Sequence, residues 1–179
     1  MQKLPLLWLD LEMTGLDAEK DVILEIAVTA TDFNLETMVE GPDLVIHQSE
    51  ENLKNMGKWV SDMHAKSGLI ERVAASRVTV QEAEKAVLAF VHEMCDKDFY
   101  FAGNTIYQDR NFLKKYMPTL NSKAHYRMID VSTLKVLIQA WYPHAPERMF
   151  KKSKTHRALD DVRESIAELG HFRKYFFKN

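Results

Sequence analysis

Four carboxylates and one histidine stand out in this sequence, because several acids occupy positions that folding alone would give to apolar side chains. Asp10 and Glu12 lie in the segment WLDLEMTG, Asp109 follows a Gly-Asn-Thr turn, and His156 and Asp161 lie in the segment HRALDD. An ionised carboxylate that is buried without a partner costs more free energy than a small domain tolerates. A cation is therefore the expected partner of these acids.

Carboxylate oxygens suit hard divalent cations such as Mg²⁺ or Mn²⁺, and the sequence has no cluster of Cys and His residues of the kind that holds zinc. Two such ions, about 3.5–4 Å apart, can activate water and stabilise the leaving oxygen during attack on a phosphodiester. In this arrangement Asp10 would bridge both ions, and His156 would accept the proton of the water. The acids expected to complete the two ion shells are Glu12, Asp109 and Asp161.

The hydrophobic pattern predicts the elements that must position these residues. Three strands are expected at residues 6–13, 22–33 and 38–47, and their short connections favour antiparallel neighbours. The segment from Thr79 to Glu82 has the form of a capping box. It is followed in the prediction by a helix to residue 94, a strand at 99–102, a helix at 107–116, a strand at 128–131, and helices at 133–141 and 157–176. The expected fold class is α/β, with a mixed sheet whose first three strands are antiparallel, flanked by helices.

The period of each element predicts the direction in which the acids point. Asp10 and Glu12 are two residues apart in a strand, so both side chains leave the same face as Trp8. The alternative is an ordinary half-exposed strand with its polar residues outward. Asp109 begins a helical stripe with Phe112, Leu113 and Tyr116, which favours a buried acid, although an acid in a first helical turn also stabilises the helix dipole.

His156 and Asp161 are five residues apart and do not share a helix face, but a loop histidine and an aspartate in the second helical turn can converge. Asp161 shares a stripe with the small residues Ala158 and Ser165, which would let this helix approach the sheet until the acid reaches Asp10. The competing interpretation of His156 is a residue that caps the helix.

Composition sets the broad class. The chain has 179 residues, of which 46% are hydrophobic, and contains no linker-like segment, so one domain is expected. Cys95 is the single cysteine, which excludes an intrachain disulfide, and neither a signal-peptide pattern nor a membrane-length apolar run is found. These features predict a soluble protein of a reducing compartment with no membrane partner.

The formal charge of −2 hides an asymmetry between the two parts of the chain. Residues 1–109 carry 9 Lys and Arg against 20 Asp and Glu, whereas residues 110–179 carry 15 against 6. A basic segment around His156 could hold a phosphate backbone, although a solvated charged loop explains the same pattern. Its residues are Lys151, Lys152, Lys154 and Arg157.

The spacing of Asp10-x-Glu12, Asp109 and His156-x4-Asp161 resembles the histidine branch of the DEDD 3′-to-5′ exonuclease superfamily, which has a ribonuclease H-like fold. The segments DLEMTGL, GNTIYQDR, HYR, DVSTLK and HRALDDVRES resemble the oligoribonuclease family more closely, and the similarity spans nearly the whole chain. Thr105 and Tyr107 depart from the family pattern, in which serine and glycine stand at these positions.

The resemblance implies a single 3′-to-5′ exonuclease domain over residues 1–179. It implies a cytoplasmic, homodimeric enzyme that uses two divalent cations, Mg²⁺ or Mn²⁺. The implied substrates are very short RNAs, dinucleotides above all, which are converted to 5′-mononucleotides. Two rival functions remain open: a non-catalytic RNA-binding module and a proofreading-type deoxyribonuclease.

The resemblance also assigns substrate-binding roles. Leu16 is the expected wedge between two bases, and Trp59 and His64 are expected to line the base pocket. Tyr126 is expected to reach into the site of the partner subunit. The residues expected to cap the 5′ phosphate are Thr105, Arg127 and Ser132. The alternatives are that Leu16 and Trp59 are core residues and that Ser132 is a helix cap.

Overall fold

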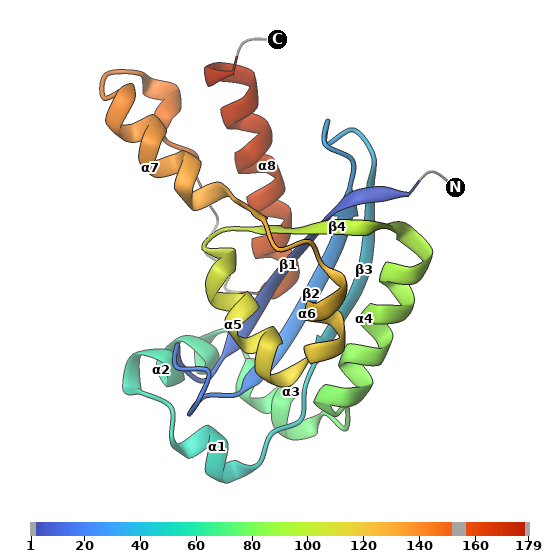
Figure 1. Ribbon diagram of the computed structural model, residues 1–179. Coiled ribbons are helices and arrows are strands. Elements are labelled where there is room, and N and C mark those ends of the chain that lie inside the picture. Colours follow the sequence, from blue (N-terminus) through green and yellow to red (C-terminus); the bar gives the residue numbers. More distant parts are fainter. Residues whose placement is uncertain (1–2, 152–156, 178–179) are drawn as a thin grey trace.

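The computed structural model describes residues 3–151 and 157–177, and its centre is a five-stranded sheet flanked by helices (Figure 1). The strands are β1 (Leu4–Met13), β2 (Ile23–Thr31), β3 (Met38–Val45), β4 (Cys95–Gly103) and β5 (Met128–Asp130). The helices are α1 (Glu50–Lys54), α2 (Lys58–Lys66), α3 (Leu69–Ala75), α4 (Val80–Met94), α5 (Ile106–Tyr116), α6 (Pro118–Lys123), α7 (Val131–Trp141), the 3₁₀ helix η1 (Pro146–Arg148) and α8 (Ala158–Phe176).

The strand order is β3-β2-β1-β4-β5. The first three strands pair antiparallel, whereas β4 runs parallel to β1 and β5 runs parallel to β4. The mixed sheet predicted from the sequence is therefore confirmed. None of the helices within the described ranges is long and apolar enough to cross a membrane.

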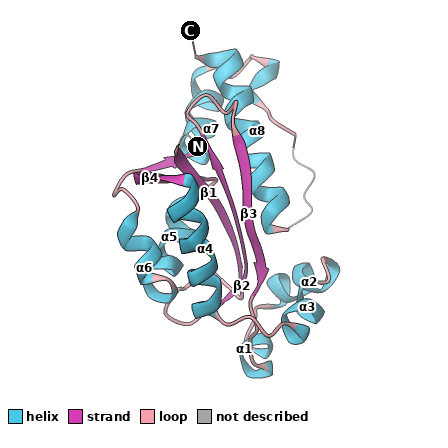
Figure 2. Cartoon of the chain, turned by 90° about the vertical axis from the view of Figure 1, so that its right-hand side faces the viewer, coloured by secondary structure: helices cyan, strands magenta, loops and turns pink. Residues whose placement is uncertain are grey.

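The two faces of β1 contribute to two separate hydrophobic cores, as its period-2 pattern predicts. Leu7, Leu9 and Leu11 pack under α4, α5 and α6, whereas Leu6 and Trp8 pack under α7 and α8. Figure 2 shows α4, α5 and α6 on one side of the sheet and α8 on the other. Because Asp10 and Glu12 share the face of Trp8, they point toward α8.

The helices between β3 and α4 were not predicted from the sequence. α1, α2 and α3 are each nine residues long or shorter. They surround a small third core, whose buried side chains are Leu24 of β2, Met56, and Leu69 and Val73 of α3. Such short helices show too few turns for a clear hydrophobic period, and packing against β2 stabilises them. α6 was missed for the same reason.

Candidate active site

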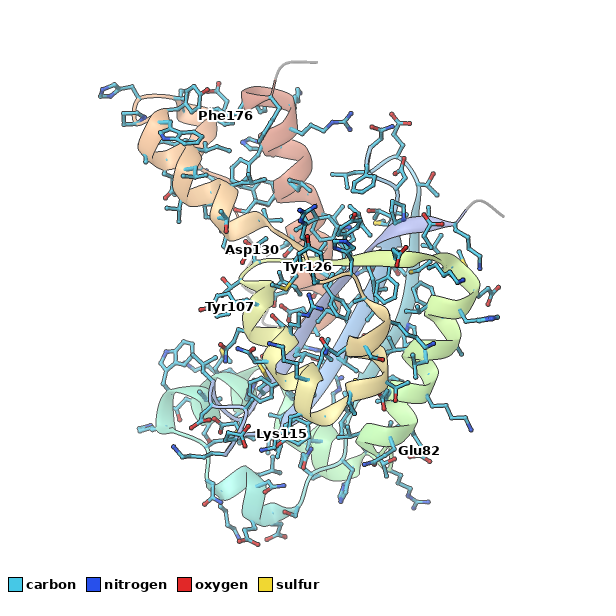
Figure 3. The ribbon with its side chains drawn as sticks, viewed as in Figure 1. Glu82, Tyr107, Lys115, Tyr126, Asp130 and Phe176 are labelled. Atoms are coloured by element: carbon cyan, nitrogen blue, oxygen red, sulfur yellow. The ribbon has the colours of Figure 1, made fainter. Side chains whose placement is uncertain are left out.

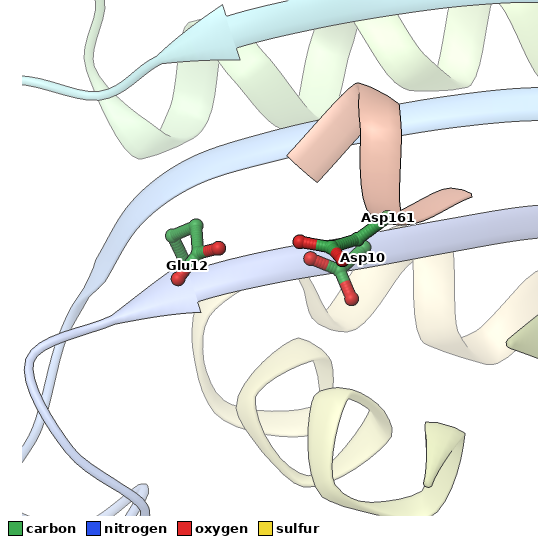
Figure 4. A group of neighbouring side chains, drawn as sticks. All are labelled: Asp10, Glu12 and Asp161. Carbon is green, nitrogen blue, oxygen red and sulfur yellow. The ribbon is translucent and has the colours of Figure 1, made fainter. Parts of the chain in front are cut away.

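β1 and α8 bring three of the predicted acids together. Asp10 and Glu12 project from β1 toward the first turns of α8, where Asp161 lies (Figure 4). Each offers one carboxylate oxygen, and these three oxygens lie within 4.8 Å of one another. The alternative interpretation of β1, with its polar side chains turned to solvent, is excluded by the burial of Glu12, which is 8% exposed.

Small and apolar side chains allow α8 to approach the sheet. Ala158 and Val162 are buried against the core that contains Trp8, and Ser165, one turn beyond Asp161, is also buried. The Ser165 hydroxyl donates to the Asp161 carbonyl at 2.8 Å. The predicted convergence of Asp161 with Asp10 thus follows from the small residues on the same stripe.

The acidic cluster brings several carboxylates close together in partly buried surroundings. The pKa of Glu12 is raised to about 8, mainly by burial and in addition by repulsion from Asp161, Glu25 and Asp109, against a smaller opposing effect of Arg157. A carboxyl group in such surroundings either keeps its proton or gains a cation. The oxygen-only donor set of these three residues fits a hard divalent cation.

Asp109 lies beside this cluster on α5. It is buried, as its helical stripe predicted, and its Oδ1 atom accepts a hydrogen bond from the Leu11 N–H at 3.0 Å. Burial raises the pKa of Asp109 to about 7. Since Leu11 separates Asp10 from Glu12, this bond holds α5 against the part of β1 that carries the other acids. Asp109 is not one of the three acids whose oxygens lie within 4.8 Å of one another.

The predicted base, His156, lies outside the described residues, as do Lys152 and Lys154 of the basic segment. Lys151 is exposed. Arg157 does not belong to a purely solvated loop, because its guanidinium pairs with the buried Glu25. One of the four cations predicted to hold a phosphate backbone is therefore engaged inside the protein.

α2 presents the two residues expected in the base pocket in opposite ways. Trp59 is 73% exposed, which excludes the alternative of a core residue, whereas His64 is fully buried. The His64 Nε2 atom lies 2.9 Å from the Met13 carbonyl and so carries the proton, because a carbonyl can only accept. Nδ1 lies 3.9 Å from Oε2 of Glu12, which places the imidazole beside the acidic cluster.

Leu16 is 74% exposed at the tip of the β1–β2 loop, which likewise excludes a role in the core. Three side chains of α5 hold this loop through its backbone carbonyls. Gln108 donates to Leu16, Lys115 donates to Ala18 at 2.7 Å, and the Tyr116 hydroxyl donates to Asp21 at 2.6 Å. Figure 3 shows Lys115 at the C-terminal end of α5. The helix that carries Asp109 therefore also fixes the predicted wedge.

Two of the residues expected at the 5′ phosphate lie together. Thr105 Oγ1 is 3.1 Å from Ser132 Oγ, and Thr105 has a left-handed backbone with a φ of 56°. The N-cap of α7 is Asp130, whose side chain accepts from the Ser132 N–H, so Ser132 is not the helix cap of the alternative interpretation. The Ser132 hydroxyl donates to Oδ1 of Asn104 at 2.9 Å.

Tyr126 and Arg127 lie on the connection between α6 and β5. Figure 3 shows Tyr126 near Asp130. Both are exposed, and the Arg127 guanidinium lies 5.1 Å from the centre of the Tyr126 ring. Tyr126 also stacks on His125 at a centroid distance of 4.5 Å. These contacts hold the exposed tyrosine ring at the surface.

Sequence reasoning missed three residues that organise the site, namely Glu25, Asn104 and Gln108. Glu25 had a clear signal, since it is a charged residue inside the apolar run ILEIAV of β2. Asn104 had none, because its role comes from long-range contacts: its amide donates to Ser165 Oγ at 2.8 Å and to Oε2 of the buried Glu168 at 3.0 Å.

Comparison with known proteins identifies the family. Residues 7–169 match the exonuclease family. The chain is 52% identical over 174 residues to a probable oligoribonuclease of Dictyostelium discoideum, covering 97% of this chain and 90% of that protein. It is 51% identical over 174 residues to the oligoribonuclease of Pseudomonas aeruginosa strain PAO1, covering 97% and 96%.

Solved structures show the same fold at low sequence identity. Exonuclease I from Methylocaldum szegediense superposes with a TM-score of 0.71 at 19% identity, over 97% of this chain and 41% of that one. The chain thus spans about two fifths of exonuclease I, and the likeness confirms the expected ribonuclease H-like fold. Taken with the acidic cluster of β1 and α8, these matches show that the chain belongs to the exonuclease family and, within it, to the oligoribonucleases.

Proposed function

We propose that this protein is a 3′-to-5′ exoribonuclease that degrades short oligoribonucleotides, dinucleotides above all, to 5′-mononucleotides. The observation that carries the proposal is the convergence of Asp10, Glu12 and Asp161 from β1 and α8 in one partly buried cluster. The names of the relatives that match nearly the full chain support the same substrate class. In this proposal the exonuclease domain extends over residues 1–179, and the enzyme acts in the cytoplasm.

The proposed cofactors are two divalent cations, Mg²⁺ or Mn²⁺. Asp10, Glu12 and Asp161 would hold them, together with Asp109 from the adjacent helix. When bound, such ions lower the pKa of a coordinated water and neutralise charge on the phosphodiester. The role of His156 would be to accept the proton of the attacking water, for which an imidazole has a suitable pKa near neutral pH.

The surroundings of the cluster suggest how a short chain is selected. Leu16, on the loop that follows β1, and Trp59, on the helix whose His64 lies beside Glu12, are apolar side chains that remain largely exposed. Such surfaces can contact or stack on bases. Thr105, Ser132 and Arg127 are proposed to bind the 5′ phosphate. A pocket closed at the 5′ phosphate of a dinucleotide leaves no outlet for a longer chain, so affinity should fall as nucleotides are added.

We further propose that the working form is a homodimer. Tyr126 is 71% exposed, and on α7 and just beyond it Val136, Trp141 and Tyr142 are also exposed. The upper ends of α7 and α8 project together beyond the sheet (Figure 1). The exposed apolar side chains of α7 would offer a second copy a surface to pack on. Tyr126 would then reach the site of the partner subunit.

A time course on 5′-phosphorylated RNAs of two nucleotides and longer, with Mg²⁺, with Mn²⁺ and with a chelator, tests the function. We expect metal-dependent conversion of the dinucleotide to mononucleotides, with slower cleavage of longer chains. RNA binding without cleavage at any length would instead support a binding module, and equal cleavage of the matching DNA would support a deoxyribonuclease.

A further inference from the structure

Glu25 is a buried carboxylate that is not among the acids proposed to hold the cations. It is the third residue of β2 and is fully buried, as is every other residue of that strand. In the antiparallel register Glu25 lies directly opposite Glu12 of β1, so both carboxylates share one face of the sheet. Like charges in this arrangement destabilise a sheet unless other groups compensate them.

Three residues from two distant segments donate four hydrogen bonds to the Glu25 carboxylate. Arg72 of α3 donates to Oε1 at 2.7 Å, and Arg157 donates to the same oxygen at 3.0 Å. Oε2 accepts from the Arg157 Nε at 3.4 Å and from the backbone N–H of Ala158 at 3.3 Å. The Glu25 carboxylate therefore pairs with two arginine cations and accepts a hydrogen bond from one of the backbone N–H groups at the start of α8.

This contact sets where α8 begins. Arg157 is the residue that precedes the first turn, and its backbone carbonyl accepts the hydrogen bond of the Asp161 N–H at 2.9 Å. Thus Glu25 holds Arg157 and Ala158, and Arg157 holds the backbone of Asp161. His156 comes immediately before Arg157 in the sequence.

We propose that Glu25 is a positioning residue of the hydrolytic site, which fixes the first turn of α8 against β2 so that Asp161 stays within reach of Asp10 and Glu12. This inference rests on the proposed function. Stability alone does not require such a group, because a buried ion cluster can be replaced by well-packed apolar residues without loss of stability. What apolar residues cannot supply is a set of directional bonds that defines one position of the helix start.

The first test is Glu25→Gln, which keeps the shape of the side chain but replaces one accepting oxygen with an NH₂ group. The matched control is Glu40→Gln. Glu40 of β3 also binds an arginine of α8, Arg163, through two bonds of 2.7 and 3.0 Å, but this pair is exposed and lies beyond the first turn. Circular dichroism and thermal unfolding verify that both variants are folded.

Two measurements are made on each variant: direct Mn²⁺ binding, followed by the electron paramagnetic resonance signal of unbound Mn²⁺, and kcat and KM on a 5′-phosphorylated RNA dinucleotide. For Glu25→Gln we expect Mn²⁺ binding and kcat each to fall by roughly 10–100-fold, the usual effect of losing a group that orients metal ligands. KM for the dinucleotide should change by less than about 3-fold, since the hydrogen-bond partners of Glu25 are not residues proposed to bind the substrate. Glu40→Gln should match the wild type.

Unchanged Mn²⁺ binding in folded Glu25→Gln would overturn the inference, as would an equal loss in Glu40→Gln or no Mn²⁺ binding by the wild type. If Glu25→Gln does not fold, Arg157→Gln decides the question, because its partly exposed side chain can be replaced with less disruption. Weaker Mn²⁺ binding in that variant supports the inference, and wild-type binding refutes it. A wild type that binds Mn²⁺ but cleaves no RNA would refute the proposed function alone.

Discussion

The electrostatic strain at Glu12 predicts that Glu12→Gln stabilises the metal-free protein at alkaline pH while abolishing its activity. The pKa of Glu12 is raised from 4.5 to about 8, mainly by burial. Because the folded state binds the Glu12 proton more tightly than the unfolded state, protonation of Glu12 stabilises the folded state. This stabilisation is fully present below pH 4.5. It is lost as pH rises through about 8, where the folded protein must accept a buried negative charge.

The size of the effect follows from the shift. At about 1.4 kcal/mol per pKa unit, the full shift corresponds to on the order of 5 kcal/mol, and structural relaxation around the charge should leave roughly 2 kcal/mol. For a protein of this size that is a rise of roughly 4–8 °C in Tm for Glu12→Gln at pH 9. At pH 4 the two proteins should differ by less than about 2 °C.

Thermal unfolding by calorimetry, after treatment with chelator, measures this difference at pH 4 and pH 9. Glu40→Gln is the control, because the Glu40 carboxylate is exposed and Arg163 lowers its pKa, so this variant should gain nothing at pH 9. Addition of Mn²⁺ at pH 8 should raise the Tm of the wild type more than that of Glu12→Gln. A variant that is no more stable than the wild type at pH 9 would refute the reasoning.

Three further variants test other parts of the site. Asp109→Asn should lower kcat by at least about 10³-fold without lowering Tm, because the amide oxygen can still accept from the Leu11 N–H. Near-normal kcat would exclude Asp109 as an ion ligand. Leu16→Ala should lower kcat/KM for the RNA dinucleotide by roughly 10-fold. Because Leu16 is 74% exposed, Tm should stay nearly the same, and a large drop in Tm would indicate a structural role instead. His156→Ala should lower kcat by roughly 10²–10⁴-fold while Mn²⁺ binding is retained, and a small change in kcat would argue against a general base.

Local periodicity predicted the parts of the site that depend on one element. The alternation of β1 placed Asp10 and Glu12 on the face of Trp8, and the helical stripe of α5 predicted the burial of Asp109. Small residues beside Asp161 indicated a close approach of α8. These inferences held because the direction of a side chain in a strand or helix depends on the backbone period, which the sequence displays directly.

Contacts between distant segments were decided by the tertiary structure. No feature of the sequence near Leu16 predicts that Lys115, almost a hundred residues later, holds its loop. Likewise, Glu25 pairs with Arg157, which is 132 residues away in the sequence. The exposure of Leu16 and Trp59, for which the sequence allowed a core position equally well, was settled in the same way. Such contacts depend on how whole elements pack together, and a local sequence pattern does not predict that packing. The sequence by itself therefore determined which chemistry this protein can hold and on which faces, whereas the folded chain determined how the reacting groups are fixed.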